Sequence, residues 1–273
     1  MKRITPPYPA RHLPRRPRRW PFAASRPPAE VPIIARTLRV GGSRLHYLSA
    51  GEAGPPLVLV HGFSSSSRWW RHNIGPLARQ HRVYALDLVG FGRSWPKHRF
   101  TLDRAMEAVL LWMDAVGLER ADLCGHSMGG FLCMRLAAAY PELVRRLVLV
   151  DAAGLPFDAP LATLMRRAYR SSRHTGLRFV PTSVTTTLQA GPLVLLQAAR
   201  DLLGRDARDL LSQIRTPTLV IWGEEDALIP LSLGLSLHMG IAHSRLAVIP
   251  GAGHNVMYEQ PEAFNLLVLD FLT

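Results

Sequence analysis

Three residues of this chain have the types and the order that nucleophilic catalysis requires. Ser127 stands at the centre of residues 125–129, Gly-His-Ser-Met-Gly, which fit the pattern G-x-S-x-G. A serine hydroxyl is a poor nucleophile at neutral pH, so it needs a base to take its proton and an acid to orient that base. His254 is the candidate base, and Asp226 is the candidate orienting acid. Their order along the chain (Ser, Asp, His) is the order that accompanies this serine motif.

Each of these residues follows a short apolar run that is typical of a β-strand. Residues 121–124 precede the serine, and apolar side chains at helical spacing follow it. A serine in so tight a strand-to-helix turn has strained backbone angles, and glycines beside it leave room for neighbouring backbone. The runs 218–222 and 246–249 likewise precede Asp226 and His254. The sequence therefore predicts three loops that each carry one catalytic group.

The rest of the chain alternates apolar runs with helical segments. The predicted strands are 57–60, 83–86, 121–124, 147–150, 218–222 and 246–249. Short, continuously apolar strands separated by helices indicate a mostly parallel sheet that is covered on both faces. Residues 37–49 predict an opening antiparallel hairpin, and a C-terminal helix is expected from about Glu259. We therefore predict a doubly wound α/β fold, whose active site lies at the carboxyl ends of the strands.

These motifs resemble the α/β-hydrolase fold family from about residue 37 to the C-terminus. The resemblance also rests on residues 61–63, His-Gly-Phe, and on residues 87–94, Asp-Leu-Val-Gly-Phe-Gly-Arg-Ser. It implies that the backbone N–H groups of Phe63 and Met128 form the oxyanion hole.

Several neighbouring residues receive a plainer interpretation. Those interpreted as bracing or spacing residues are His61, Asp87, Arg93 and His126. Some members of the family take the triad acid from the position of Asp151, which is therefore kept as an alternative to Asp226. Trp69 and Trp70 open the segment after the oxyanion loop, and core packing is favoured over a role in the pocket wall.

One interval between strands exceeds 60 residues, which is too long for a simple crossover. Residues 158–173 place apolar side chains on one helical face and arginines on the other, and residues 192–203 repeat the apolar pattern. An insertion at this point is commonly a lid in the family that the chain resembles. We therefore interpret residues 154–212 as a small helical cap on a core that comprises residues 37–153 and 213–273.

The N-terminal residues 1–36 are predicted to form a separate basic arm. Residues 1–30 contain eight Lys or Arg and eight Pro against a single acidic residue, Glu30, in a chain of net charge +13. This composition cannot bury enough apolar surface to order a segment. The arginine pairs at 15–16 and 18–19 are reminiscent of an export signal, but no apolar stretch of the required kind follows. A cytoplasmic protein is predicted.

Other features of the composition narrow the classes of function. The two cysteines, Cys124 and Cys133, lie on elements that are predicted to be buried and indicate free thiols. The 11 histidines show no metal-ligand spacing, and no phosphate-binding or dinucleotide motif is present, so neither a metal nor a cofactor is predicted. No apolar run reaches the ~18 residues of a membrane span. The basic arm is interpreted as a solvated tail without a specific nucleic-acid partner, and a homodimer is left open.

Ester hydrolysis through an acyl-enzyme is the simplest reaction for this set of groups. The expected partner is a small-molecule ester with a small or medium acyl chain. One alternative is C–C bond hydrolysis of diketones of the meta-cleavage type, and another is perhydrolysis of the cofactor-free haloperoxidase type. A receptor-like role in ligand binding has less support, because the triad is intact. The sequence leaves the physiological substrate and the mobility of the lid open.

Overall fold

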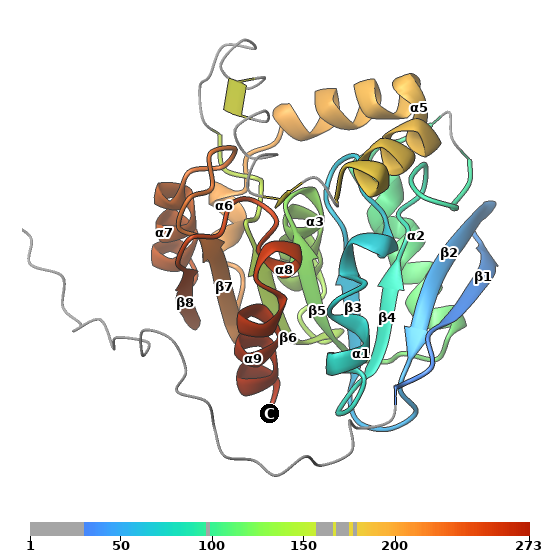
Figure 1. Cartoon of the computed structure of the whole chain (residues 1–273), viewed down its shortest axis with the longest axis horizontal. Coiled ribbons are helices and arrows are strands. Elements are labelled where there is room, and N and C mark those ends of the chain that lie inside the picture. The colour runs from blue at the N-terminus through green and yellow to red at the C-terminus, as the bar shows by residue number, and fades with distance from the viewer. Residues whose placement is uncertain (1–29, 97–98, 157–165, 168–174, 177–178) are drawn as a thin grey trace, which may run out of the picture. The chain divides into compact units, whose positions relative to one another are not determined.

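The computed structural model describes residues 30–96, 99–156, 166–167, 175–176 and 179–273 (Figure 1). Val31–Thr273 forms one unit. Most of the predicted arm and most of the predicted helix 158–173 lie outside the described residues. The interpretation of residues 154–212 as a cap therefore rests on their second half.

An eight-stranded sheet forms the centre of this unit. Its strands are β1 (Ile34–Val40), β2 (Ser43–Ala50), β3 (Pro56–Val60), β4 (Arg82–Leu86), β5 (Ala121–His126), β6 (Val144–Val150), β7 (Thr218–Gly223) and β8 (Ser244–Ile249). They lie in the order β1-β2-β4-β3-β5-β6-β7-β8. β2 is antiparallel to both of its neighbours, β1 and β4, and all other neighbouring pairs are parallel. The six predicted strands are confirmed to within three residues at either end.

The opening hairpin begins earlier than the sequence predicts. β1 starts at Ile34, so the last three residues of the proposed arm, 34–36, belong to the sheet. Ile34 pairs with Ser49 across the hairpin, and Arg36 donates from Nε to the Ser49 hydroxyl at 3.0 Å. The sequence shows no alternation of apolar and polar residues here, because β1 is an edge strand whose first four side chains are exposed.

Helices cover both faces of the sheet. They are η1 (Ser67–Trp70), α1 (Ile74–Leu77), α2 (Leu102–Ala115), α3 (Met128–Ala139), α5 (Val180–Leu203), α6 (Arg208–Leu211), α7 (Leu231–Gly240), α8 (Val256–Glu259) and α9 (Pro261–Leu272). One apolar core gathers side chains of α2, α3, α6 and α7 such as Leu132 and Leu237. A second core gathers those of η1, α1, α8 and α9 such as Trp70 and Phe264 (Figure 1). The doubly wound α/β class is thereby confirmed.

Two helices differ from their predicted limits. The predicted helix 192–203 is the second half of α5, which begins at Val180 and is interrupted at Gly191 (φ 76°, ψ 162°). The residue before a proline avoids helical angles, and only glycine adopts this φ easily, so Gly191 and Pro192 together make the break. The expected C-terminal helix is α9, which begins at Pro261, close to the predicted start near Glu259, and follows the short helix α8.

Backbone segments approach one another closely around the turn between β5 and α3. A Cβ atom on Gly129 would lie 2.4 Å from the carbonyl oxygen of Val60 and 2.5 Å from that of His61. A Cβ on Gly125 would lie 2.4 Å from the carbonyl oxygen of Gly129. Because the contacted atoms belong to the backbone, a change of side-chain rotamer cannot relieve the overlap with an added Cβ.

Gly129→Ala should therefore destabilise the protein by about 1–3 kcal/mol through overpacking. Gly75→Ala in α1 is the matched control, because a Cβ there meets nothing within 4 Å and alanine favours a helix. Urea unfolding of both variants measures the difference. Equal midpoints for the two variants would show that the turn does not depend on this close approach.

Candidate active site

Ser127 occupies the strained turn that the sequence predicts. It directly follows β5 and is the N-cap residue of α3, with φ 51° and ψ −117°, angles that cost a non-glycine residue about 1–3 kcal/mol. Its N–H donates to the carbonyl oxygen of Val150 at 2.9 Å, and its own carbonyl accepts from Phe131 and Ala153. These contacts hold the strained residue between β6 and α3.

The loop after β3 lies directly against the serine. A Cβ on Gly62 would lie 3.0 Å from the Cβ of Ser127, so this stretch of loop passes within van der Waals distance of the nucleophile. Phe63 follows in this loop and lines the same cavity as Ser127. Met128 is the first residue of α3, where N–H groups have no partner within the helix. Both predicted oxyanion residues therefore flank Ser127.

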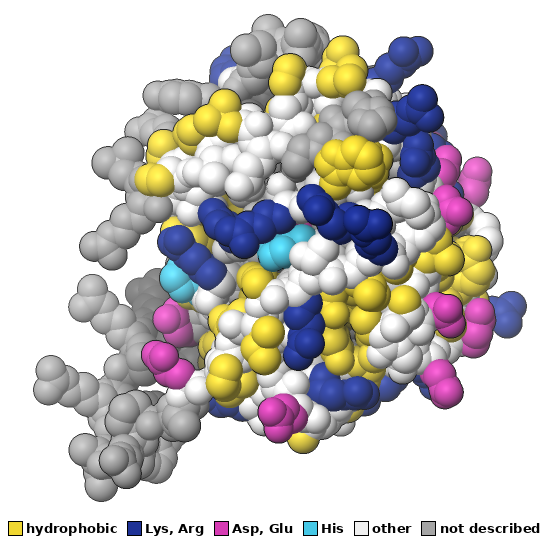
Figure 2. All heavy atoms as spheres, turned by 90° about the vertical axis from the view of Figure 1, so that its right-hand side faces the viewer, with side chains coloured by type: hydrophobic (Ala, Val, Ile, Leu, Met, Phe, Trp, Pro, Cys, Tyr) yellow, Lys and Arg dark blue, Asp and Glu magenta, His cyan; other side chains and the backbone are white. Residues whose placement is uncertain are grey.

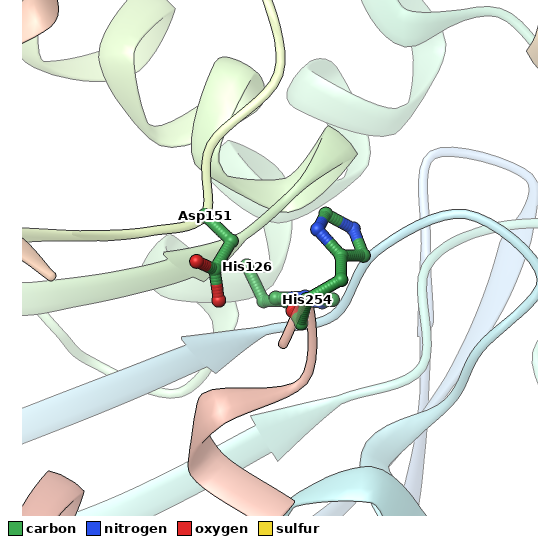
Figure 3. Close-up of side chains that lie close together, drawn as sticks. All are labelled: His126, Asp151 and His254. Atoms are coloured by element: carbon green, nitrogen blue, oxygen red, sulfur yellow. Dashed lines mark hydrogen bonds between the residues drawn. The ribbon is translucent and has the colours of Figure 1, made fainter. Parts of the chain in front are cut away.

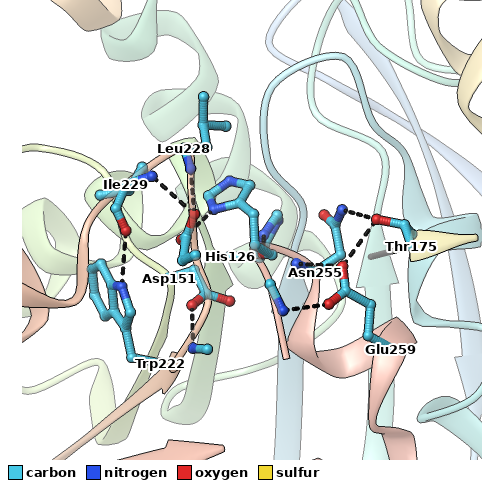
Figure 4. Close-up of polar contacts among 12 residues, drawn as sticks. His126, Asp151, Thr175, Trp222, Leu228, Ile229, Asn255 and Glu259 are labelled. Carbon is cyan, nitrogen blue, oxygen red and sulfur yellow. Dashed lines mark hydrogen bonds and ion pairs between the residues drawn. The ribbon is translucent and has the colours of Figure 1, made fainter. Parts of the chain in front are cut away.

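Asp226 and His254 meet at the ends of β7 and β8. The Asp226 Oδ2 atom lies 2.8 Å from Nδ1 of His254, and both side chains are buried. The other oxygen, Oδ1, accepts the N–H groups of Leu228 at 2.8 Å and Ile229 at 2.9 Å (Figure 4). Because a carboxylate fixed in this way accepts a proton-bearing Nδ1, Nε2 is the nitrogen of His254 left to act as a base.

A cavity of about 270 Å³ opens over these groups. Its described lining is mainly apolar and consists of Phe63, Trp69, His126, Ser127, Thr175, Gly176, Phe179, Val180, Ser183, Val184, Leu228, His254 and Asn255. Ser127 and His254 share this cavity, and Asp226 lies behind the histidine. The structure therefore brings together all three residues of the predicted triad.

Asp151, the alternative triad acid, lies close to the site but in a different role. It is fully buried at the end of β6, and its Oδ1 atom accepts the N–H of Gly223 at 2.8 Å. Burial, and then the neighbouring Asp226 carboxylate, raise the pKa of Asp151 well above its ordinary value. In the described part of the chain, the carboxylate that accepts the hydrogen bond from Nδ1 of His254 belongs to Asp226.

His126, interpreted from the sequence as a spacer, supports the catalytic loop. Its Nε2 atom lies 2.8 Å from the carbonyl oxygen of His254, so this nitrogen carries the proton and donates. Burial, followed by the nearby His254, lowers the pKa of His126 well below its ordinary value, which keeps the ring neutral. No feature of the sequence indicates this contact, because it joins positions 128 residues apart.

His126, Asp151 and His254 form a group of potential metal ligands, with one atom of each within 4.8 Å of the others (Figure 3). Each already has a protein partner. His126 Nε2 bonds to a carbonyl, Asp151 Oδ1 to an amide and His254 Nδ1 to Asp226. We therefore treat the group as part of the triad's surroundings, and the absence of a metal stays a prediction.

A further polar network, which sequence reasoning missed, surrounds the His254 loop (Figure 4). Glu259 accepts the N–H of Gly253 at 2.5 Å and the hydroxyl of Thr175 at 2.9 Å. The Thr175 hydroxyl in turn accepts the side-chain amide of Asn255 at 3.0 Å. The Glu259 carboxylate thus fixes the backbone of Gly253, just before His254, and through Thr175 it fixes the side chain of Asn255, just after His254.

Both tryptophans pack in the core, and Trp69 also lines the cavity. Trp69 lines the cavity and packs its ring edge-on against Phe179, with 4.6 Å between ring centroids. Trp70 is fully buried against Phe264. The prediction of core packing is confirmed for both tryptophans, and Trp69 in addition forms part of the cavity wall with Phe179, which lies more than 100 residues away along the sequence.

The bracing residues join the loops at the carboxyl ends of the strands. His61 Nδ1 donates to the Gly62 carbonyl at 2.7 Å, and its Nε2 accepts the N–H of Leu88 at 3.0 Å. Asp87 accepts the N–H groups of Ser67 and Arg93. Burial alone would raise the pKa of Asp87, but a hydrogen bond from a histidine ring and these amides hold it below its ordinary value.

Comparison with known proteins identifies the family. Residues 57–265 match the family model described as the alpha/beta hydrolase family. The chain belongs to this family. A related hydrolase is 31% identical to this chain over most of the length of both proteins. The sequence similarity therefore supports the assignment of the chain as a hydrolase.

Two relatives and one solved structure illustrate the range of this hydrolase family. The chain is 31% identical to a 2-hydroxy-6-oxononadienedioate/2-hydroxy-6-oxononatrienedioate hydrolase of Pseudomonas sp., covering 85% of this chain and 93% of the relative. It is 33% identical to a 2-hydroxy-6-oxo-2,4-heptadienoate hydrolase of Pseudomonas putida, covering 88% and 96%. The enol-lactonase of Burkholderia xenovorans LB400 superposes with a TM-score of 0.72 at 26% identity, covering 87% and 99%.

Among the described residues of this hydrolase, no helix is long and apolar enough to cross a membrane.

The roles of the two aspartates can be separated by amide substitution. Asp226→Asn should lower kcat by about 10⁴-fold, because an amide no longer fixes the tautomer of His254. Asp151→Asn should change kcat only a few-fold, since an amide oxygen still accepts the Gly223 N–H. A large loss for Asp151→Asn with a small one for Asp226→Asn would transfer the triad role to Asp151.

The same pair predicts a pH dependence of stability. Because the pKa of Asp151 is raised in the folded protein, its contribution to stability is present at low pH and is lost as the pH rises through the folded pKa. Asp151→Asn mimics the protonated acid, so its stability relative to wild type should increase as the pH rises from the ordinary pKa of an aspartate through neutrality. Urea unfolding across this range measures the difference, and a constant difference would show that Asp151 is ionised in the fold.

Proposed function

We propose that this protein is a serine hydrolase that cleaves neutral carboxylic esters with small or medium acyl chains. Ser127 Oγ attacks the ester carbonyl while His254 Nε2 takes its proton, and Asp226 holds the imidazolium that forms. The N–H groups of Phe63 and Met128 bind the negative oxygen of the tetrahedral intermediate. Collapse breaks the C–O bond, and His254 returns the proton to the leaving alcohol. Water then repeats the sequence to release the acid.

The composition of the cavity wall is the observation that carries this choice. Six of its described lining residues are large and apolar: Phe63, Trp69, Phe179, Val180, Val184 and Leu228. The described lining contains no Lys or Arg. A carboxylate on the substrate would lose its water there without a fixed cation to pair with, which is costly. A neutral acyl chain instead gains from transfer to such a wall.

C–C bond hydrolysis of a diketone acid is the second candidate. The names of the two relatives above, both hydrolases of 2-hydroxy-6-oxo acids, favour it. The same triad would assist ketonisation of the substrate before cleavage. This candidate requires a cation for the substrate carboxylate, and the described cavity wall does not supply one.

Parallel assays separate the candidates. Wild-type protein should hydrolyse short-chain p-nitrophenyl esters with a larger kcat/KM than a 2-hydroxy-6-oxo dienoate. Ser127→Ala should lose about 10⁴-fold or more in turnover with either substrate. A large preference for the dienoate would replace the ester proposal with C–C hydrolysis. Near wild-type rates for Ser127→Ala would refute both.

The second half of the proposed cap contributes to the cavity through the first half of α5. Val180, Ser183 and Val184 line the cavity. Leu195, which the sequence pattern places on the inner face, packs instead against the core on the other side of the kink, and Leu164 lies outside the described residues. We propose that α5 sets the acyl-chain length that the enzyme accepts.

Val184→Trp should therefore shift the chain-length profile toward shorter esters by filling the cavity. The triad should keep its reactivity, so labelling of Ser127 by a small phosphonate should proceed at the wild-type rate. Leu188→Trp is the matched control, because Leu188 lies one helical turn further along α5 and is 76% exposed. An unchanged ester profile for Val184→Trp would remove α5 from the substrate pocket.

A further inference from the structure

A second and larger hollow lies at the turn of the β1–β2 hairpin. Its volume is about 530 Å³, and it shares no described lining residue with the catalytic cavity. It is lined by Arg39, Val40, Gly41, Gly42, Ser43, Arg44 and Trp95. Nothing in the proposed ester hydrolysis uses these residues.

The register of the hairpin places two arginines side by side. The two-residue turn Gly41-Gly42, with φ of 51° and 73°, sets Arg39 directly opposite Arg44. Residues directly opposite on antiparallel strands point to the same face of the sheet. The backbone N–H and C=O of Arg44 are both used by Trp95, so Arg39 and Arg44 form a non-hydrogen-bonded pair. Side chains are closest in pairs of this kind.

Trp95 lies beside this pair of arginines. It forms an antiparallel bridge with Arg44, in which each backbone N–H donates to the other's carbonyl at 2.9 Å. The indole therefore projects to the same face as the two arginines. Trp95 is 49% exposed, which is unusual for so large an apolar side chain. The three side chains form a row: guanidinium, guanidinium, indole.

The charge of this row is uncompensated within the described chain. Neither Arg39 nor Arg44 has a carboxylate within 4.0 Å there, and the hollow has no acidic residue in its described lining. On the β1–β2 side of the molecule, Lys and Arg side chains gather across the middle, and acidic side chains lie nearer the margins (Figure 2). Like charges directly opposite one another destabilise a sheet. The arginine pair therefore does not stabilise the hairpin. Its charge and position instead suit the binding of an anionic ligand.

We propose that this hollow binds a planar organic anion, that is, a phosphate or carboxylate group attached to a flat ring. Two adjacent guanidinium groups bind either anion through charge-assisted hydrogen bonds, and the indole provides a surface on which the ring stacks. The volume lies within the range of small-molecule sites. Nucleoside phosphates and aromatic carboxylates share this chemistry.

Calorimetric titration of the full-length protein tests the proposal. The probes are AMP and benzoate, with adenosine and inorganic phosphate as the ring and the anion alone. AMP or benzoate should bind at one saturable site, more tightly than its separate parts and more weakly as NaCl is raised. Which of the two binds distinguishes the sources. No binding of any probe up to 10 mM would overturn the proposal.

Variants locate the site. Arg39→Gln and Arg44→Gln should each weaken binding about tenfold, the usual loss for one charge-assisted contact. Trp95→Leu should weaken binding of the ring-bearing probe and leave that of phosphate unchanged. Arg120→Gln, at an exposed arginine outside the hollow, is the control and should bind as wild type. Binding that Arg39→Gln and Arg44→Gln leave unchanged would place the ligand elsewhere and overturn the proposal.

The stability of the ligand-free protein separates a binding role from a structural one. Removing one charge of an opposed pair should leave Tm unchanged or raise it by on the order of 1 °C, while binding falls. Arg44→Lys keeps the charge but not the planar fork, so it should keep wild-type Tm and still bind more weakly. A fall in Tm for Arg39→Gln that matches its loss of binding would assign the pair to folding instead.

Discussion

The close approach of the loop after β3 to the turn at Ser127 is the contact on which the site depends. A Cβ on Gly62 would lie 3.0 Å from that of Ser127, and a Cβ on Gly129 would meet the backbone carbonyls of Val60 and His61. The two predicted oxyanion donors, Phe63 and Met128, are the neighbours of these glycines. The contact that packs the two segments is therefore also a contact that places the two predicted donors around Ser127.

The buried titratable groups around the triad are mostly kept neutral. Burial raises the pKa of Asp151 and lowers those of His61 and His126, so each of them avoids an unpaired charge in the interior. The two oxygens of Asp226 accept two backbone amides and the ring of His254. Of the two buried carboxyl groups, the one with three donors is the one positioned to face the imidazolium that forms during catalysis.

The sequence predicted features that depend on neighbouring residues. It did not predict contacts between residues that lie far apart in the chain. The turn at Ser127 could be predicted because strand, glycines and helix are contiguous, and the strands because their apolar runs are short and bounded. The part of Trp69 in the cavity wall has no local signal, because its partner Phe179 lies far away along the sequence. The contact of His126 with the His254 backbone has no local signal at all. The early start of β1 was hidden because an exposed edge strand has no apolar period.

The link between α5 and the oxyanion loop gives the proposed cap a second role besides shaping the pocket. Ser64, the residue after Phe63, has φ 54°, which a non-glycine residue keeps only when its surroundings hold it there. Those surroundings are α5: Thr186 donates its hydroxyl to the Ser64 carbonyl at 2.9 Å, and the Ser64 and Thr187 hydroxyls lie 2.8 Å apart. A movement of α5 would release this strain next to the Phe63 N–H. The helix that we propose to select the acyl chain would then also govern how well the proposed oxyanion hole is formed, so changes in α5 are expected to affect kcat together with KM.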